Sequence, residues 1–292
     1  MRGYAAIGGV AWLAIVTLAA AGSAIGLATA VLFAVLGLLV LGTLATIVTT
    51  HRLLQRVLAG VSRLDTSKFD ADLNATGNLV RRDLRKTFRQ VEAMQNLYAI
   101  LDIQHALPAS RGFPASPDLL LFLVDLVDRH RPRMIVECGS GLSTLCLALA
   151  MRRFGIDGKV VALEHLAEYA EQSEELLRRH EVGNLAEVRR APLEPFAFDG
   201  SSIDWYAEVA WKDLDGIDLL FVDGPPSKLS RNARYPSIPL LYDRLAASAH
   251  IVLDDYARTK EKAVVERWRN DYPSLVVENI SLEKGAALLT RR

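Results

Sequence analysis

The chain has 292 residues, of which 34 are basic and 34 acidic, so its formal net charge at neutral pH is zero. A chain without net charge has no general attraction for nucleic acid, and we expect no DNA or RNA partner. Its length allows one full domain of about 100 to 200 residues and a further segment. The only two cysteines, Cys138 and Cys146, lie in apolar segments, which favours buried thiols in a reducing compartment.

The N-terminus is an apolar run with no charged residue between Arg2 and His51. The run is more than twice as long as the roughly 20 residues that cross a bilayer as a helix. It is also longer than the apolar core of a signal peptide, which has about 7 to 15 residues. We predict a transmembrane region over residues 1–50 with two helices, at about 4–20 and 25–48, and a single span is the alternative.

Positive charges flank both ends of this region, with Arg2 on one side and Arg52 and Arg56 on the other. Lys and Arg near a span tend to stay in the cytoplasm. The sequence therefore predicts a protein of the cytoplasmic membrane whose remaining residues face the cytoplasm.

Residues 51–107 form the next segment, which we interpret as a helical connector. Its apolar residues recur with helical spacing over 53–64 and again over 79–103, and a looser patch lies at 70–78. The connector could pack on the bilayer surface, on itself, or on a second copy in a homo-oligomer formed through residues 51–105. Its basic residues could contact anionic lipid, although we favour a solvated helix face; they are Arg81, Arg82, Arg85, Lys86 and Arg89.

A third region, residues 108–292, begins with a stretch rich in Pro, Gly and Ser at 108–117, which is typical of a boundary. Short apolar runs then alternate with helical patterns, which indicates a doubly wound, mostly parallel α/β sheet that we expect to have seven strands. The last two strands have only a short turn between them, so we expect an antiparallel hairpin at the C-terminus. The predicted strands are 134–136, 160–163, 186–188, 217–222, 250–253, 275–280 and 286–289, and the predicted helices are 143–153, 167–180, 239–247 and 260–270.

A glycine-containing loop follows the first of these strands and reads Glu-Cys-Gly-Ser-Gly-Leu-Ser-Thr over residues 137–144. Glycine lets the backbone turn tightly and approach a ligand at the carboxyl end of a strand. The dinucleotide fingerprint needs a third glycine at position 144, where this chain has Thr, so an NAD-dependent oxidoreductase is disfavoured. The carboxylate of Glu137 would repel a pyrophosphate but could neutralise a sulfonium or an ammonium, which favours S-adenosylmethionine.

An acid closes the second strand at Glu164, about 25 residues after the glycines. A carboxylate in this place can accept hydrogen bonds from both hydroxyls of a ribose. The alternative is an acid that stabilises the N-terminus of the next helix. His165 follows directly and could lie against an adenine or face solvent.

Three further acids follow two later strands, Asp223 in an Asp-Gly-Pro-Pro turn and the pair Asp254 and Asp255. In a parallel sheet these carboxylates converge on one edge. Clustered carboxylates repel one another unless they are protonated or bind a cation, and Mg²⁺ prefers such oxygen ligands. The alternative is that Asp223 starts a turn and that Asp254 or Asp255 caps a helix.

Taken in this order, the four motifs resemble those of class I S-adenosylmethionine-dependent methyltransferases, and most of all the bacterial branch of macrocin-type sugar O-methyltransferases. The resemblance covers residues 111–289. It implies that the glycine loop binds the methionine part of the cofactor, that Glu164 binds the ribose, and that Asp223, Asp254 and Asp255 bind a metal. The loop residues concerned are Glu137, Gly139, Ser140, Gly141 and Ser143, with His165 beside the adenine. Pro225 to Ser227 stand where sugar-acting members often have a further acid, which weakens the case for the metal.

The sequence thus predicts a membrane-anchored O-methyltransferase for a hydroxyl on a sugar, a glycolipid or another small molecule. Asp223 and Asp254 are the catalytic candidates, with Mg²⁺ as an optional second cofactor. The loop after the Asp-Gly turn would suit a phosphorylated or glycosylated acceptor, and a merely solvated loop is the alternative; its residues include Lys228, Arg231, Arg234 and Tyr235. The alternative function is a membrane-tethered scaffold whose methyltransferase-like domain does no chemistry.

Overall fold

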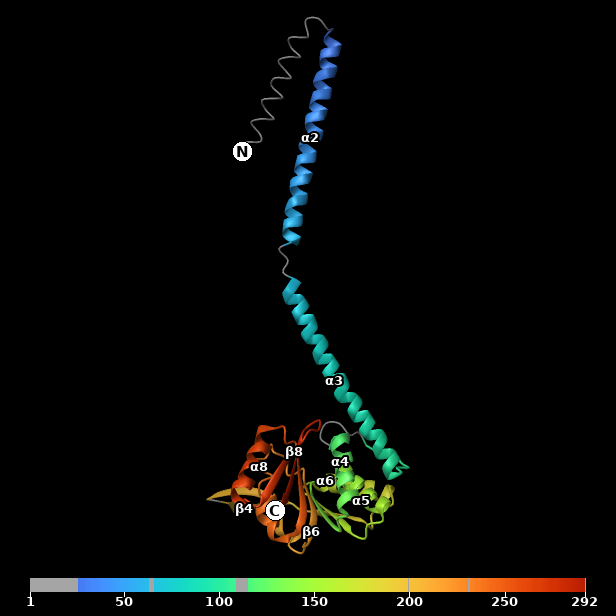
Figure 1. Ribbon diagram of the computed structural model, residues 1–292, viewed down its shortest axis with the longest axis vertical. Coiled ribbons are helices and arrows are strands. Elements are labelled where there is room, and N and C mark those ends of the chain that lie inside the picture. The colour runs from blue at the N-terminus through green and yellow to red at the C-terminus, as the bar shows by residue number, and fades with distance from the viewer. Residues whose placement is uncertain (1–25, 63–65, 109–114, 199, 231, 292) are drawn as a thin grey trace. The chain divides into compact units, whose positions relative to one another are not determined.

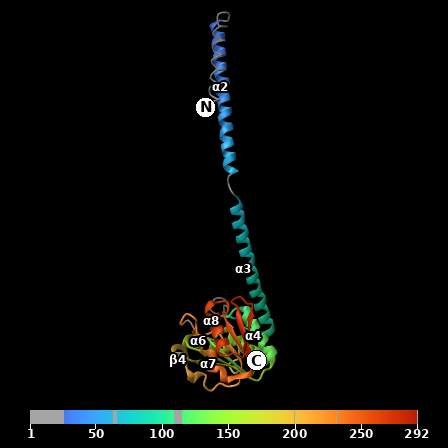
Figure 2. The same ribbon diagram turned by 60° about the vertical axis from the view of Figure 1, so that its left-hand side comes forward.

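The structure is a computed structural model that describes residues 26–62, 66–108, 115–198, 200–230 and 232–291. The chain divides into two compact units, Met1–Leu79 and Val80–Arg292. The first predicted membrane helix lies outside the described residues. Figure 1 and Figure 2 show the described elements from two directions.

Most of the second predicted membrane helix, from residue 27 onward, lies in α2 (Leu27–Val61), which continues without interruption into the predicted connector. Its segment Val31–Val61 is long and apolar enough to cross a membrane, by length and composition alone. The large apolar side chains of this segment are exposed within the described structure, and Leu38 is 69% exposed. Thr43 and Thr46 turn their hydroxyls back onto helix carbonyls at 2.8 Å.

The following helix, α3 (Thr66–Leu101), is continuous. The prediction of a looser patch at 70–78 was therefore wrong. Gly77 and its Asn neighbours lower helix propensity by about 1 kcal/mol each at most, and the strongly helical sequence on the C-terminal side outweighs that cost. The Thr76 hydroxyl also donates to the carbonyl of Asp72 at 2.8 Å, inside the helix.

The C-terminal region contains the seven-stranded sheet, in the order β3-β2-β1-β6-β7-β9-β8. β9 pairs antiparallel with β7 and with β8, whereas the other pairs are parallel, so the predicted mixed sheet and C-terminal hairpin are confirmed. The strands are β1 (Met134–Cys138), β2 (Lys159–Glu164), β3 (Ala186–Arg190), β6 (Ile217–Val222), β7 (Leu245–Asp254), β8 (Leu275–Ile280) and β9 (Ala286–Arg291).

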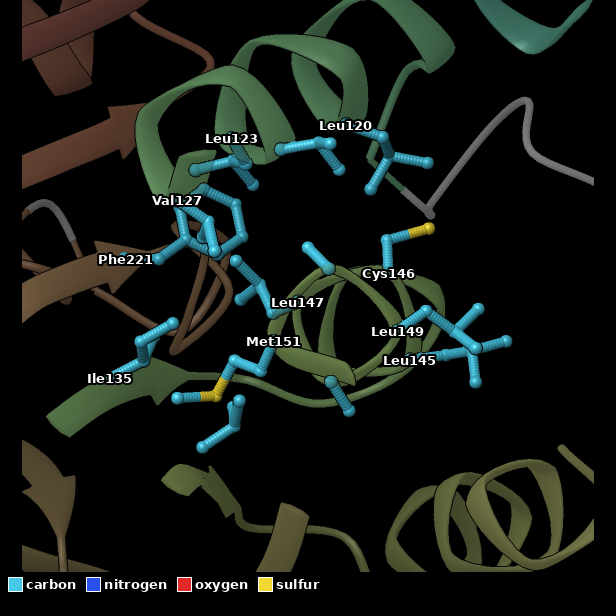
Figure 3. Packing of buried hydrophobic residues seen from close by; sticks show 14 of the residues in the cluster. Leu120, Leu123, Val127, Ile135, Leu145, Cys146, Leu147, Leu149, Met151 and Phe221 are labelled. Carbon is cyan, nitrogen blue, oxygen red and sulfur yellow. The ribbon is translucent and has the colours of Figure 1, made fainter. Parts of the chain in front are cut away.

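Alternate residues of the central strands point to opposite faces of the sheet, and each face has its own apolar cluster. One face, with Ile135 and Phe221, packs against α4 (Pro117–His130) and α5 (Leu142–Phe154), as Figure 3 shows. Cys146 is buried in this cluster and Cys138 in the other, and both are free thiols, as predicted. The helix α6 (Ala167–Arg179) follows β2 and contributes Leu177 to the first cluster.

The opposite face contains elements that the sequence did not indicate. A two-stranded hairpin of β4 (Leu193–Phe198) and β5 (Ser201–Tyr206) brings Trp205 and Tyr206 into the second cluster. The predicted helix at 239–247 was wrong, because only α7 (Ser237–Leu241) and a short 3₁₀ turn (Tyr242–Arg244) precede β7. β7 begins at Leu245 and pairs there with Ile217, so the alanine-rich residues 246–249 become part of an extended strand. The helix α8 (Thr259–Asp271) completes this face.

Candidate active site

The glycine loop joins β1 to α5 and takes a backbone form that favours glycine. Gly139 has φ +113° and Gly141 has φ +146°, both in the region that side chains disfavour. The amide of Gly139 donates to the carbonyl of Leu163 at the end of β2, at 2.9 Å. The loop is therefore fastened to the neighbouring strand at the carboxyl edge of the sheet.

Glu137 lies beneath this loop and is 1% exposed. Its carboxylate accepts hydrogen bonds from the hydroxyls of Ser143 and Thr144, and the Thr144 hydroxyl in turn accepts the Gly141 amide at 3.0 Å. Burial raises the pKa of Glu137 to about 7, against the lowering effect of the two hydroxyls. Thr144, which replaces the third glycine of the dinucleotide fingerprint, thus braces the loop, a role that sequence reasoning missed.

Glu164 ends β2 and is held by three donors. Ser140 Oγ lies 3.2 Å from Glu164 Oε2, and the Leu166 amide donates to Oε1 at 2.9 Å. His165 Nδ1 is 3.0 Å from the same Oε1. Burial acts to raise the pKa of Glu164, but these donors outweigh it and lower the pKa overall. The glycine loop and the acid of the second strand, predicted as separate parts of one site, are therefore in direct contact through Ser140.

The same loop also borders the Asp-Gly turn after β6. The Asp223 amide donates to the carbonyl of Cys138 at 3.1 Å. A Cβ on Gly224 would lie 2.3 Å from the Tyr206 hydroxyl and 3.2 Å from the Cys138 carbonyl, so this close approach needs glycine. Tyr206 is buried, and this burial raises the pKa of its hydroxyl well above the ordinary value. The negative charges of Glu164 and Asp223 act in the same direction. Sequence reasoning missed Tyr206 because it did not predict the hairpin that carries it.

The three predicted aspartates come together at the carboxyl ends of β6 and β7, where Val222 pairs with Leu253. One carboxylate oxygen from each of Asp223, Asp254 and Asp255 lies within 4.8 Å of the others. Asp254 and Asp255 are buried, whereas the side chain of Asp223 is 23% exposed. Asp223 is therefore the member of this acid cluster that an acceptor could reach.

A guanidinium lies among these acids. Arg234 Nη2 is 3.1 Å from Asp223 Oδ1 and 3.1 Å from Asp255 Oδ2, and it donates to the Asp223 carbonyl at 2.6 Å. Its Nη1 donates to the Asp254 carbonyl at 2.9 Å. Arg234 is only 4% exposed, so the expectation that it contacts substrate from a solvated loop was wrong. The reason is that the chain after Asp223 folds inward and places this arginine under the edge of the sheet.

Burial and mutual repulsion govern the protonation of the acid cluster. Burial raises the pKa of Asp223 to about 6, with Arg234 opposing the rise and Asp255 adding to it. Burial, followed by repulsion from Asp223 and Asp255, raises the pKa of Asp254 to about 8. Within the cluster a proton is therefore favoured on Asp254, whereas Arg234 favours the ionised form of Asp223.

The arrangement does not fit a directly coordinated Mg²⁺. Mg²⁺ needs oxygen ligands at about 2.0–2.1 Å in near-octahedral geometry. In the acid cluster, Asp223 and Asp255 each direct an oxygen to Arg234, and Asp254 Oδ1 accepts the Asp255 amide at 2.6 Å. The positive charge that the sequence led us to expect from a metal is provided here by Arg234, with Arg258 Nη1 a further 2.8 Å contact of Asp255 Oδ2.

A cavity of about 590 Å³ lies beside the acid cluster. Asp223, Asp255 and Arg234 line its inner part, and cationic side chains from three segments line the rest; these are Lys228, Arg258, Lys260 and Lys284. Lys260 Nζ donates to the Ser227 carbonyl at 2.7 Å and so ties α8 to the loop after the Asp-Gly turn. The amide of Ala257 donates to the Lys284 carbonyl at 3.0 Å, which fixes the β8–β9 turn against the same site.

Comparison with known proteins gives a family match and similarities to solved structures. Residues 136–256 match the family model Methyltransf_24, described as a methyltransferase domain. No curated protein sequence matches the chain. Among solved structures, a methyltransferase from Podospora anserina bound to SAH is 17% identical, with 68% of this chain and 88% of that chain covered and a TM-score of 0.49. An O-methyltransferase from Bacillus cereus in complex with SAH is 19% identical, with 70% and 90% covered and a TM-score of 0.47.

The matched segment runs from the middle of β1 to the turn after β7, and so contains the glycine loop, Glu164 and the acid cluster. The match identifies residues 136–256 as a methyltransferase domain and supports methyltransferase activity for the chain.

Proposed function

We propose that the chain is an S-adenosylmethionine-dependent O-methyltransferase that a membrane helix holds at the bilayer. The observation that carries the proposal is the double contact of the glycine loop. Through Ser140 the loop touches Glu164, and through the Cys138 carbonyl it holds Asp223. A cofactor bound along this loop would have an acid for its ribose at one end and an acid for the acceptor's proton at the other.

In this proposal the loop backbone at Gly139 and Gly141 receives the methionine part of the cofactor, with Ser143 as part of the brace below it. The carboxylate of Glu137 offers a negative charge to the ammonium, Glu164 accepts from the ribose hydroxyls, and His165 lies beside the adenine. The ring of His165 is 6.4 Å from that of Tyr206, so an aromatic pair borders this end of the site.

The reaction is an in-line displacement. The acceptor oxygen forms a bond to the methyl carbon, the bond from that carbon to sulfur breaks with its electron pair on sulfur, and S-adenosylhomocysteine leaves. Asp223 takes the proton of the acceptor hydroxyl, because it is exposed to the cavity and ionised near neutral pH. Asp254 is 2% exposed and acts on this site by holding the Asp255 amide. His250, the alternative base, packs against His130 at 3.8 Å and lies four residues before the end of β7.

The acceptor, in this proposal, is a hydroxyl of a sugar, a glycolipid or another small molecule that carries a negative charge. The cavity lining has five cationic side chains (Lys228, Arg234, Arg258, Lys260, Lys284) against three acidic ones (Asp223, Asp255, Glu261). An excess of positive charge in a cleft concentrates anions there. A phosphate or carboxylate group on the acceptor would meet this charge while the hydroxyl lies at Asp223.

The membrane part of the proposal rests on α2. Its exposed leucines, isoleucines and valines are costly in water, and its threonine hydroxyls are bonded within the helix, as a bilayer requires. We expect the chain to stay in the membrane pellet after alkaline extraction. A Ser62→Cys variant should react with an impermeant maleimide only after the cells are opened, and labelling of intact cells would contradict the cytoplasmic orientation.

Methyl transfer itself is tested with membranes that contain the full-length chain and S-adenosylmethionine labelled in the methyl group. We expect label in an acidic extract fraction, and none when the membranes contain Glu164→Ala. Cofactor binding without label transfer to any fraction would favour the scaffold function instead.

A further inference from the structure

The surroundings of Arg234 point to more than a surface ion pair. Its two terminal nitrogens contact carboxylates or carbonyls of all three members of the acid cluster, at 2.6 to 3.1 Å. Arg is always protonated in proteins, and its planar fork can bond several oxygens at once. Arg258 Nη1 also lies 2.8 Å from Asp255 Oδ2, but its side chain is half exposed, so Arg234 is the buried cation that contacts all three acids.

The backbone around Arg234 is built to keep it there. The Ser237 hydroxyl donates to the Arg234 carbonyl at 2.7 Å. The next residue, Tyr235, accepts the Trp268 indole N–H at its carbonyl at 2.8 Å and donates its hydroxyl to Asp271 at 2.7 Å. The backbone at Arg234 is therefore fixed by Ser237 of α7, and Tyr235 is fixed by two residues of α8.

Not all oxygens of the acid cluster are used. Asp254 Oδ2 and Asp255 Oδ1 are buried and have no hydrogen-bond partner among the described residues. Buried carboxylate oxygens without a partner are costly, and they would accept a cation if one could enter. In this arrangement the guanidinium stands in the way.

We propose that Arg234 is the resident cation of the acid cluster, a positioning residue that takes the place of a divalent metal and holds Asp223 toward the acceptor. The proposal leads to an unusual expectation: removal of the arginine should create a metal site. It rests on the proposed function only for the role of Asp223, because metal binding can be measured without cofactor or acceptor.

The test uses the full-length protein in detergent, with Mn²⁺ as the probe and electron paramagnetic resonance to count bound ions. We expect wild type and the matched control Arg269→Met, whose arginine is on the exposed side of α8, to bind no Mn²⁺ at this site. Arg234→Met should bind one Mn²⁺, and Arg234→Met with Asp255→Asn should lose it. In a thermal melt, excess Mn²⁺ should raise the Tm of Arg234→Met by on the order of 5 °C and leave wild type unchanged.

Two results would overturn the proposal. One is a Mn²⁺ ion bound to wild type that Asp255→Asn removes, which would make the cluster a metal site after all. The other is a folded Arg234→Met that gains no site. If Arg234→Met does not fold, Arg234→Lys serves instead. The single nitrogen of lysine lacks the planar fork that contacts both carboxylates and both carbonyls, so we expect weak Mn²⁺ binding that wild type lacks, and its absence would count against the proposal. The proposed methyl transfer stands or falls separately, through cofactor binding.

Discussion

The glycine loop and the acid cluster lie at the ends of the adjacent strands β1 and β6, yet their carboxylates are stabilised in different ways. Glu137 receives its donors from nearby sequence, such as Thr144 seven residues on, and Glu164 receives two of its three from the next two residues, while the third, Ser140, belongs to the recognisable glycine loop. The acid cluster depends on Arg234, which is 11 residues from Asp223 and 21 from Asp255. A site whose partners all belong to recognisable motifs can be predicted from the sequence, whereas a site completed by a side chain outside any motif cannot.

The largest effect should come from the acid cluster. We expect Asp223→Asn to lower the rate of methyl transfer by about 10² to 10⁴, because the amide cannot take the acceptor's proton. Cofactor affinity should stay within a factor of two or so, since Asp223 holds the glycine loop through its backbone amide. Label transfer and calorimetry measure the two quantities, and the exposed Asp243→Asn is the matched control. An equal loss of methyl-transfer rate and of cofactor affinity would show that Asp223 supports the glycine loop and does not act in proton transfer.

A smaller effect is expected on the glycine loop, where an alanine in place of a glycine with positive φ should lower the stability of the protein. Gly139 has φ +113° with no atom closer than 3.8 Å to a built Cβ, so strain and not a clash opposes alanine. We expect Gly139→Ala to lower the free energy of unfolding by about 1 to 3 kcal/mol. Thermal unfolding in detergent tests this, with Gly183→Ala, where φ is not positive and the space is open, as the control. Equal stability of the two variants would contradict the strained loop.

The pH dependence of cofactor binding distinguishes the two regions further. Burial raises the pKa of Glu137 to about 7, and the ammonium of the cofactor favours the ionised carboxylate. Affinity for S-adenosylmethionine should therefore fall by about tenfold per pH unit below pH 7, and level off above it. Glu137→Gln should bind more weakly at pH 7 and show no such slope. A wild-type affinity that is constant from pH 5.5 to 7 would contradict contact between Glu137 and the ammonium.

The smallest effect should arise at the rim of the cavity. Lys228 is exposed and lines the cavity beside the acid cluster. Lys228→Gln should raise the KM for an acidic acceptor about twofold to fivefold and leave kcat unchanged, as is usual for an exposed charge. The effect should shrink at high salt. No change in KM at low salt would argue against an anionic acceptor, and Lys262→Gln, on the same helix as Lys260, is the control.

Much of the fold could be predicted because its signals are local. Apolar runs at 217–222 and 275–280 became strands with the expected bounds, and the alternation of strand and helix indicated the parallel sheet. The hairpin of β4 and β5 was missed because its strands mix charged and aromatic residues, and its formation depends on burial of Trp205 against the sheet. The alanine-rich residues 246–249 read as helix, but pairing of β7 with β6 overrode that preference.

The candidate site shows the same division. Ser140 and Glu164 were both predicted, and the structure brings them together. The three aspartates also converge, because the ends of neighbouring parallel strands must meet. The position of Arg234 could not be predicted. A basic residue in a polar loop is expected to be exposed to solvent, and only the packing of α7 and α8 shows that this one is buried.

The measurement that tests the central claim most directly is calorimetric titration of the full-length protein with S-adenosylmethionine, beside Glu164→Ala and the matched control Glu174→Gln on the exposed side of α6. We predict binding by wild type and by the control, and a loss of about 1 to 3 kcal/mol in Glu164→Ala, as expected when a charged hydrogen-bond partner is removed. Absence of binding by folded wild-type protein, or equal binding by all three, would contradict the account.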